Sequence, residues 1–190
     1  MATPAARFQI RILLALLVAL AACLATAPGA MAQKRSCKGA GAEAGQVSQR
    51  KLALATVCLL NKQRRAHGMR PLRMSRRLAL AARGHSAEMA QAKYFSHNSR
   101  SGASFLDRIR RAGYLRRAQR WSVGENIAWG TGHLSTPRSI VRAWMQSPGH
   151  RANILQRSFR HIGIGLSLGA PVHVAGRAAA TYTTDFGTRG

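Results

Sequence analysis

Histidines and carboxylates are the side chains of this sequence that could bind a metal ion or transfer protons. No His-Glu-x-x-His or Cys-x-x-Cys pair occurs, so the recognised signatures of a metalloprotease and of a cysteine redox or zinc site are absent. Any chemistry must come from imidazoles and carboxylates that are distant in sequence and that the fold brings together. The chain has seven histidines and only five acids, which are Glu43, Glu88, Asp107, Glu125 and Asp185.

Several short motifs follow one another in a fixed order along the chain. They are Phe95-Ser96-His97, Asp107-Arg108, Gly124-Glu125-Asn126-Ile127-Ala128, Ser147-Pro148-Gly149-His150-Arg151, Asn153-Ile154-Leu155 and Asp185-Phe186-Gly187. In this order and spacing the motifs resemble the CAP (SCP-like) domain in its bacterial form. The resemblance covers roughly residues 54 to 187, and the motifs around Glu125 and His150 carry most of it.

The resemblance implies a cleft in which animal and plant members of the family hold two histidines and two glutamates. His97, Glu125 and His150 match three of these four residues. The fourth, a Glu three residues after Trp144, falls on Ser147. Two neutral imidazoles and a carboxylate could bind Zn²⁺ and leave one position open for water. Glu125 could instead act as a base on a metal-bound water, and without a metal the same groups could do general acid–base catalysis.

A purely structural role for the same residues is the alternative. His97 and His150 would then hydrogen-bond backbone carbonyls and hold loops together. Glu125 would cap a neighbouring backbone segment or pair with Arg151. Because three residues match one family constellation, we favour the shared cleft. Its further neighbours are expected to be Asn126, Ser147 and Arg151.

Hydrophobic periodicity and capping residues predict the elements that must position these groups. Leu78, Ala82, His85 and Met89 recur at helical spacing, which makes His85 a packed helix-face residue. Helices are expected over about 47–68, 75–92, 104–112 and 135–147, with a helical turn over 150–155, and extended segments over about 121–129, 159–168 and 178–186. Helices followed by strands predict an α+β fold. The CAP resemblance implies a three-layer α-β-α sandwich with a small, mainly antiparallel sheet.

The first 32 residues have the pattern of a secretory signal peptide. Arg7 and Arg11 precede an apolar stretch over 12–24, and Ala30-Met31-Ala32 matches the pattern that signal peptidase cuts after. We expect residues 1–32 to be removed and the protein to be secreted or otherwise extracytoplasmic. The alternative is a lipid anchor on Cys23, because Leu20-Ala21-Ala22-Cys23 matches a lipobox.

The rest of the chain is expected to form an arm and one domain. Residues 33–46 are small, polar and rich in Gly and Ala, which predicts a flexible arm before a CAP domain over 47–190. Cys37 and Cys58 are the two cysteines left after removal of the signal peptide. In an oxidising compartment we expect them to form a disulfide that ties the arm to the first helix.

The formal net charge of +25 predicts binding to polyanions. For an exported protein these are anionic envelope polymers or lipid headgroups, and a small apolar ligand is a further candidate. The arginine runs lack interleaved aromatic residues, so we expect no sequence-specific nucleic-acid binding. We expect a monomer.

The function predicted from the sequence is a binding or interaction module at the cell envelope or outside the cell. Its cleft of His97, Glu125 and His150 would hold a divalent metal or a small ligand. The alternative is a zinc-assisted hydrolase of peptide or cell-wall material that uses the same three residues.

Overall fold

The computed structural model describes residues 36–190 of the chain. The predicted signal peptide over 1–32, with Cys23, lies outside the described residues. The described helices are α2 (Gln49–Ala66), α3 (Arg76–Ala92), α4 (Phe105–Arg111), the 3₁₀ helix η1 (Gly132–Ser135), α5 (Pro137–Gln146) and α6 (Pro148–Ile154). The strands are β1 (Arg73–Met74), β2 (Trp121–Thr131), β3 (His161–Leu168) and β4 (Ala179–Arg189). No helix within residues 36–190 is long and apolar enough to cross a membrane.

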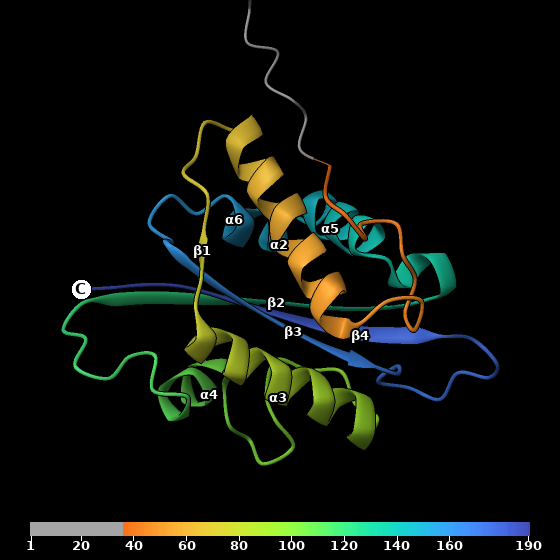
Figure 1. Ribbon diagram of the computed structural model, residues 1–190. Coiled ribbons are helices and arrows are strands. Elements are labelled where there is room, and N and C mark those ends of the chain that lie inside the picture. The colour runs from red at the N-terminus through yellow and green to blue at the C-terminus, as the bar shows by residue number, and fades with distance from the viewer. Residues whose placement is uncertain (1–35) are drawn as a thin grey trace, which may run out of the picture. The chain divides into compact units, whose positions relative to one another are not determined.

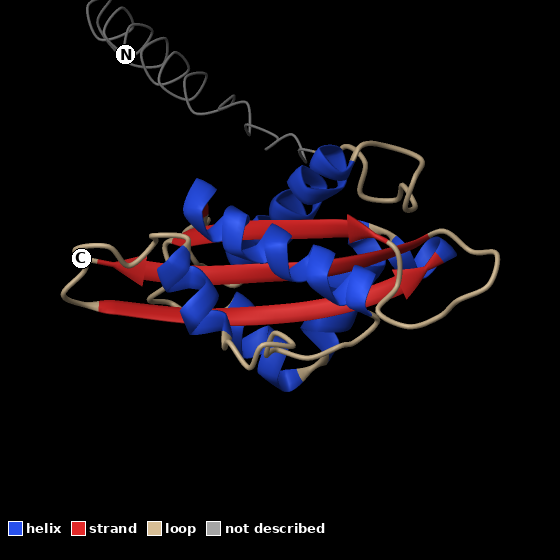
Figure 2. Ribbon diagram, turned by 90° about the horizontal axis from the view of Figure 1, so that it is seen from below, coloured by secondary structure: helices blue, strands red, loops and turns tan. Residues whose placement is uncertain are grey.

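The four strands form one sheet between two layers of helices (Figure 1). The strand order is β1-β3-β4-β2, and only the pairing of β1 with β3 is parallel. Helices α2, α5 and α6 cover one face, and α3 and α4 cover the other. Seen from below, α3 and α4 lie across the long antiparallel strands (Figure 2). The predicted α-β-α sandwich with a mainly antiparallel sheet is confirmed.

The two faces of the sheet are packed in different ways. Large side chains fill the α2–α5 face, where Trp144 of α5 and Phe186 of β4 are buried in one hydrophobic cluster. On the other face Gly163 and Gly165 of β3 let the backbone of α3 approach the sheet directly. A Cβ atom added at Gly165 would overlap the backbone carbon and oxygen of Ala82. The absence of side chains at these two positions of β3 therefore sets the position of α3.

Short polar side chains begin the helices at the residues that the sequence indicates. The predicted capping box at α4 is present, since Ser104 Oγ accepts from the Asp107 backbone N–H and the Asp107 carboxylate accepts from the Ser104 N–H. Helix α5 has Pro137 in its first turn, and Thr136 caps it by accepting from Ser139 N. These caps fix where the loop that carries His97 ends and where α5 begins.

The segment expected to be a flexible arm is packed on the domain over its described part. Ala40 and Ala44 are each 4% exposed. The N–H of Ala44 donates to Ser135 Oγ at 2.9 Å, and Arg138 N donates to the Ala40 carbonyl at 2.9 Å. Small residues that predict flexibility in a linker here allow close packing beside η1 and α5. The expected disulfide between Cys37 and Cys58 is present and ties this segment to α2.

Loss of the disulfide should destabilise the domain measurably. The bridge closes a loop with a sequence separation of 21 residues. A loop of this size lowers the entropy of the unfolded chain, which stabilises the folded protein by about 3 kcal/mol. We expect a Cys37→Ser, Cys58→Ser double variant to lose about this much free energy of unfolding in urea. A reductant should destabilise the wild type equally and leave the variant unchanged. A variant as stable as the oxidised wild type would contradict the prediction.

Candidate functional site

Three elements supply the predicted cleft residues. His97 lies in the loop between α3 and α4, Glu125 lies in β2, and His150 lies in α6. Successive residues of β2 point to opposite faces of the sheet. Glu125 points to the face covered by α3 and α4, where it contacts Arg108, while Asn126 points to the α5–α6 face, where its side chain donates to the His150 carbonyl. Strand β2 thus contributes side chains that make contacts on both faces of the sheet.

Glu125 is a buried carboxylate whose two oxygens are both engaged. Its side chain is 1% exposed. His97 Nδ1 lies 2.8 Å from Oε1, and Arg108 Nη2 donates to Oε2 at 2.7 Å. Because a buried charge needs a close counter-charge, Arg108 is the cation that compensates the Glu125 carboxylate in the interior. Arg151, the partner considered from the sequence, instead has its Nη2 3.2 Å from His67 Nε2.

His150 is the imidazole that α6 contributes to the site. Its Nδ1 lies 2.9 Å from Ser147 Oγ, so a hydroxyl occupies the position that the resemblance assigns to a glutamate. Burial lowers the pKa of His150, and positive charge on His97 lowers it further. His150 is therefore a neutral imidazole at neutral pH. Asn153 supports the strand beside it by donating to the backbone carbonyl of Glu125 at 3.1 Å and to the side chain of Asn126 at 2.9 Å.

The structure brings His97 into direct contact with Glu125, and it places His150 close enough to interact electrostatically with His97. Within residues 36–190, however, no three His, Cys, Asp or Glu side chains form a group that could hold a metal ion. Glu125 faces His97 and Arg108 with both oxygens. The hydrogen bonds at Nδ1 leave Nε2 of each imidazole as the atom able to bind a ligand.

A second acid, Asp185, lies beneath the site and was not predicted to have a role. It pairs directly with Glu125 across β4 and β2. Asp185 is 1% exposed, and neither carboxyl oxygen has a hydrogen-bond donor among the described residues. Burial, and then the negative charge of Glu125, raise the pKa of Asp185 well above its ordinary value. The positive charge of Arg108 acts to lower the pKa of Asp185, so Arg108 acts on both acids.

His85 is packed in the helix layer, as its place on the apolar stripe predicts. It is fully buried, and its Nε2 lies 2.8 Å from the Ser96 carbonyl. Burial lowers the pKa of His85. The imidazole is therefore neutral and donates through Nε2–H, which anchors the residue before His97.

Residues 165–169 have the Gly-x-Ser-x-Gly pattern of a hydrolase nucleophile. They do not form the turn on which such a nucleophile lies. Ser167 lies within β3, where it pairs with Thr181 of β4, rather than at a strand-to-helix turn. Its hydroxyl donates to the Leu168 carbonyl at 3.4 Å. Ser147 is the serine that contacts a histidine in this site.

The elements that carry His97, Glu125 and His150 thus follow one another in the order of the sequence motifs. Residues 57–174 match the family described as the cysteine-rich secretory protein family, CAP. The chain belongs to the CAP family.

Two curated relatives are an uncharacterized protein, YkwD, and an uncharacterized membrane protein, YlbC, both of Bacillus subtilis. YkwD is 39% identical over 56% of this chain and YlbC is 35% identical over 57%. The matches span 39% and 29% of those relatives, so this CAP chain corresponds to less than half of either.

Three solved structures share the fold. An extracellular SCP-domain protein of Bacillus anthracis has 29% identity and a TM-score of 0.56, over 75% of this chain and 44% of its own. An outer surface protein of Borrelia burgdorferi has a TM-score of 0.61 at 16% identity, over 76% of this chain and 97% of its own. A cysteine-rich secretory protein of Staphylococcus aureus has a TM-score of 0.51 at 17% identity, over 74% and 39%. The last two identities are low, so these two structures support the fold alone.

Proposed function

We propose that this CAP protein is an extracytoplasmic binding module whose cleft, between His97 and His150, holds a divalent metal or a small ligand. The observation that carries the proposal is the engagement of Glu125 by His97 and Arg108 at 2.8 and 2.7 Å. Because both oxygens of Glu125 make these contacts, its carboxylate orients the His97 imidazole. The description of the Bacillus anthracis protein as extracellular supports a location outside the cytoplasm.

The arrangement favours binding over hydrolysis. A general base must reach the proton that it abstracts with an unoccupied lone pair and a pKa near the working pH. Glu125 is held by a guanidinium and an imidazole, and its side chain is almost inaccessible. Ser147 and His150 form a serine–histidine contact, but no carboxylate among the described residues hydrogen-bonds to His150 to orient it. Substrate turnover abolished by Glu125→Gln would favour the hydrolase alternative and contradict the proposed binding role.

The two imidazoles fit zinc better than the three-residue set expected from the sequence. A carboxylate that accepts a hydrogen bond from one ring nitrogen fixes the tautomer and leaves the other nitrogen able to bind a metal. Glu125 does this for His97 Nδ1. Zn²⁺, when bound, would act as a Lewis acid on its remaining ligands. We therefore propose His97 and His150 as zinc ligands and Glu125 as the residue that orients His97.

Zinc titration by calorimetry tests this proposal on the exported protein. We expect the wild type to bind one zinc, and a His97→Ala, His150→Ala variant to lose binding. Glu125→Gln should weaken binding by about 10- to 100-fold, as loss of a ligand's orienting partner does, without abolishing it. A matched double variant of two exposed histidines, His133→Ala and His173→Ala, should bind as the wild type does. Equal zinc binding by both double variants would contradict the assignment.

Anionic envelope polymers or lipid headgroups are the partners proposed for the surface. The formal net charge of +25 attracts such polymers, and screening by salt weakens contacts between exposed charges. Only Asp107 and Glu125 pair with arginines within 4.0 Å among the described residues. Most cations of this part of the chain are therefore left for an external anion.

A further inference from the structure

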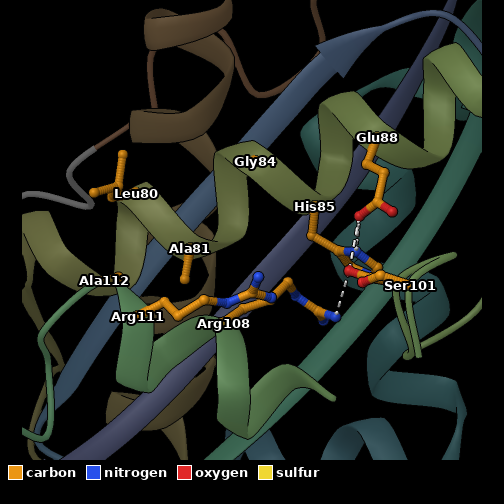
Figure 3. Close-up of a pocket in the computed structure, with 10 residues that line it drawn as sticks. Leu80, Ala81, Gly84, His85, Glu88, Ser101, Arg108, Arg111 and Ala112 are labelled. Atoms are coloured by element: carbon orange, nitrogen blue, oxygen red, sulfur yellow. Dashed lines mark hydrogen bonds and ion pairs between the residues drawn. The ribbon is translucent and has the colours of Figure 1, made fainter. Parts of the chain in front are cut away.

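A cavity lies between α3 and α4. It is a groove of about 490 Å³ (Figure 3), a size suited to a small organic molecule. Helix α3 presents residues one turn apart, and the loop after His97 closes one side. The residues that line the groove are Leu80, Ala81, Gly84, His85, Glu88, Ser99, Ser101, Arg108, Arg111 and Ala112.

Gly84 opens the groove in the middle of α3. A Cβ atom at this position would meet no atom within 4 Å, so close packing does not require a glycine there. Glycine inside a helix is less favourable than alanine, so helix stability does not require it either. Beside it, Leu80 is 56% exposed, which places an apolar side chain at the edge of a polar groove. An open helix face with an exposed leucine is suited to a ligand that has an apolar part.

Most of the hydrogen-bonding capacity of Arg108 is used within the protein. Its Nη2 donates to Glu125, and its Nη1 donates to the Ala103 carbonyl at 3.1 Å. The charge of this guanidinium is therefore balanced by the Glu125 carboxylate. Its Nε and the Nδ1 of His85 are buried without a hydrogen-bond partner among the described residues.

Glu88 brings a negative charge to the groove, and within residues 36–190 no arginine or lysine pairs with its carboxylate. Its oxygens accept from Ser99 Oγ at 2.8 Å and from the Arg100 backbone N–H at 3.0 Å, which are both neutral donors. Burial acts to raise the pKa of Glu88, but these hydrogen bonds lower it overall, so the carboxylate is ionised. His85 Nδ1 lies 3.7 Å away, and burial keeps that imidazole neutral.

Arg111 brings an unbalanced positive charge from the opposite helix. It is exposed on α4 and lies within 4.0 Å of no carboxylate among the described residues. Figure 3 shows Arg111 and Glu88 reaching the groove from different helices. A simple anion would be repelled by Glu88, and a simple cation would be repelled by Arg111. A molecule that carries both a positive and a negative charge can pair with Glu88 and with Arg111.

We propose that the α3–α4 groove binds a zwitterion of amino-acid to dipeptide size. Its ammonium group pairs with Glu88, its carboxylate pairs with Arg111, and its apolar side chain covers Leu80. Arg108 lines this groove and also pairs with Glu125, whereas His97 and His150 do not line it. The proposal uses the charges of Glu88 and Arg111, neither of which belongs to the proposed metal site.

Calorimetric titration of the full exported protein with leucine and with alanyl-leucine tests the site. We expect at least one of these zwitterions to bind with a Kd of about 1 mM or tighter. N-acetylation removes the ammonium group and C-amidation removes the carboxylate, so each should weaken binding at least about tenfold. Absence of binding by both zwitterions, or equal binding of the zwitterion and its two blocked forms, would overturn the proposal.

Variants assign each charge to its wall of the groove. Glu88→Gln should remove the discrimination against the N-acetylated ligand, and Arg111→Gln should remove the discrimination against the amide. Gly84→Leu fills the groove and should abolish binding without changing a charge. Arg83→Gln, at an exposed residue of α3 that does not line the groove, is the matched control and should bind as the wild type does. Binding unchanged in Gly84→Leu would overturn the proposed location.

Discussion

Replacement of Arg108 by methionine is expected to destabilise the protein by about 3–5 kcal/mol near neutral pH, as removal of one partner of a buried ion pair does. Methionine preserves most of the apolar volume and removes the charge. The side chain of Glu125 and the whole of Asp185 are each 1% exposed. These two paired acids would then lose the arginine that contacts Glu125. Urea unfolding monitored by circular dichroism gives the free energy directly.

The loss in Arg108→Met should grow as the pH rises. An acid whose pKa is higher in the folded than in the unfolded protein binds more protons when folded. Its stabilising effect is complete below its unfolded pKa, about 4, and is lost as the pH rises toward its folded value. Asp185 already has a raised pKa, and removal of Arg108 takes away the positive charge that opposes the shift. The stability difference from wild type should therefore increase between about pH 4 and pH 8.

Two further variants separate the charge effect from loss of helix packing. Arg110→Met makes the same change on α4, at a side chain that is 54% exposed, and should cost less than about 1 kcal/mol. Adding Glu125→Gln to Arg108→Met removes the buried charge and should restore part of the lost stability and flatten its pH dependence. Equal stability of Arg108→Met and Arg110→Met would show that Arg108 does not compensate the buried acids.

Local signals in the sequence located most of the fold. The capping box of Ser104 and Asp107 and the Thr136-Pro137 start place α4 and α5 as expected, because capping depends on residues adjacent in sequence. The two-residue strand β1 was missed, because Arg73 and Met74 are both exposed and show no alternation. The packing of Ala40 and Ala44 was missed for a related reason, since their partners in η1 and α5 lie far along the chain.

The candidate site was predictable only in part. Family motifs pointed to His97 and Glu125, which the structure places in contact. Arg108 belonged to a motif, but one arginine among 30 basic residues gives no local sign that it pairs with a buried acid. Asp185 pairs with Glu125 only through the register of β2 and β4, which a single sequence does not specify. The alternation of β2 could have suggested that Glu125 and Asn126 serve opposite faces of the sheet.

Gly165→Ala is expected to cost about 4 kcal/mol or more, or to prevent folding, because it forces a backbone clash. The new methyl group would overlap the Ala82 backbone carbon and oxygen, far inside van der Waals contact. Rotation of a side chain cannot relieve this contact, so α3 must move away from β3. Soluble yield and urea unfolding of the variant measure the effect.

The same substitution in the facing helix provides the control. Gly84→Ala meets no atom within 4 Å, and we expect it to leave stability unchanged or raise it by up to about 1 kcal/mol. Adding Ala82→Gly to Gly165→Ala should not restore stability, because the clash is with backbone atoms rather than with the Ala82 side chain. Rescue by Ala82→Gly would show that the helix backbone tolerates the methyl group. Because the loop that carries His97 follows α3, a displaced helix should also disturb the 2.8 Å contact between His97 and Glu125.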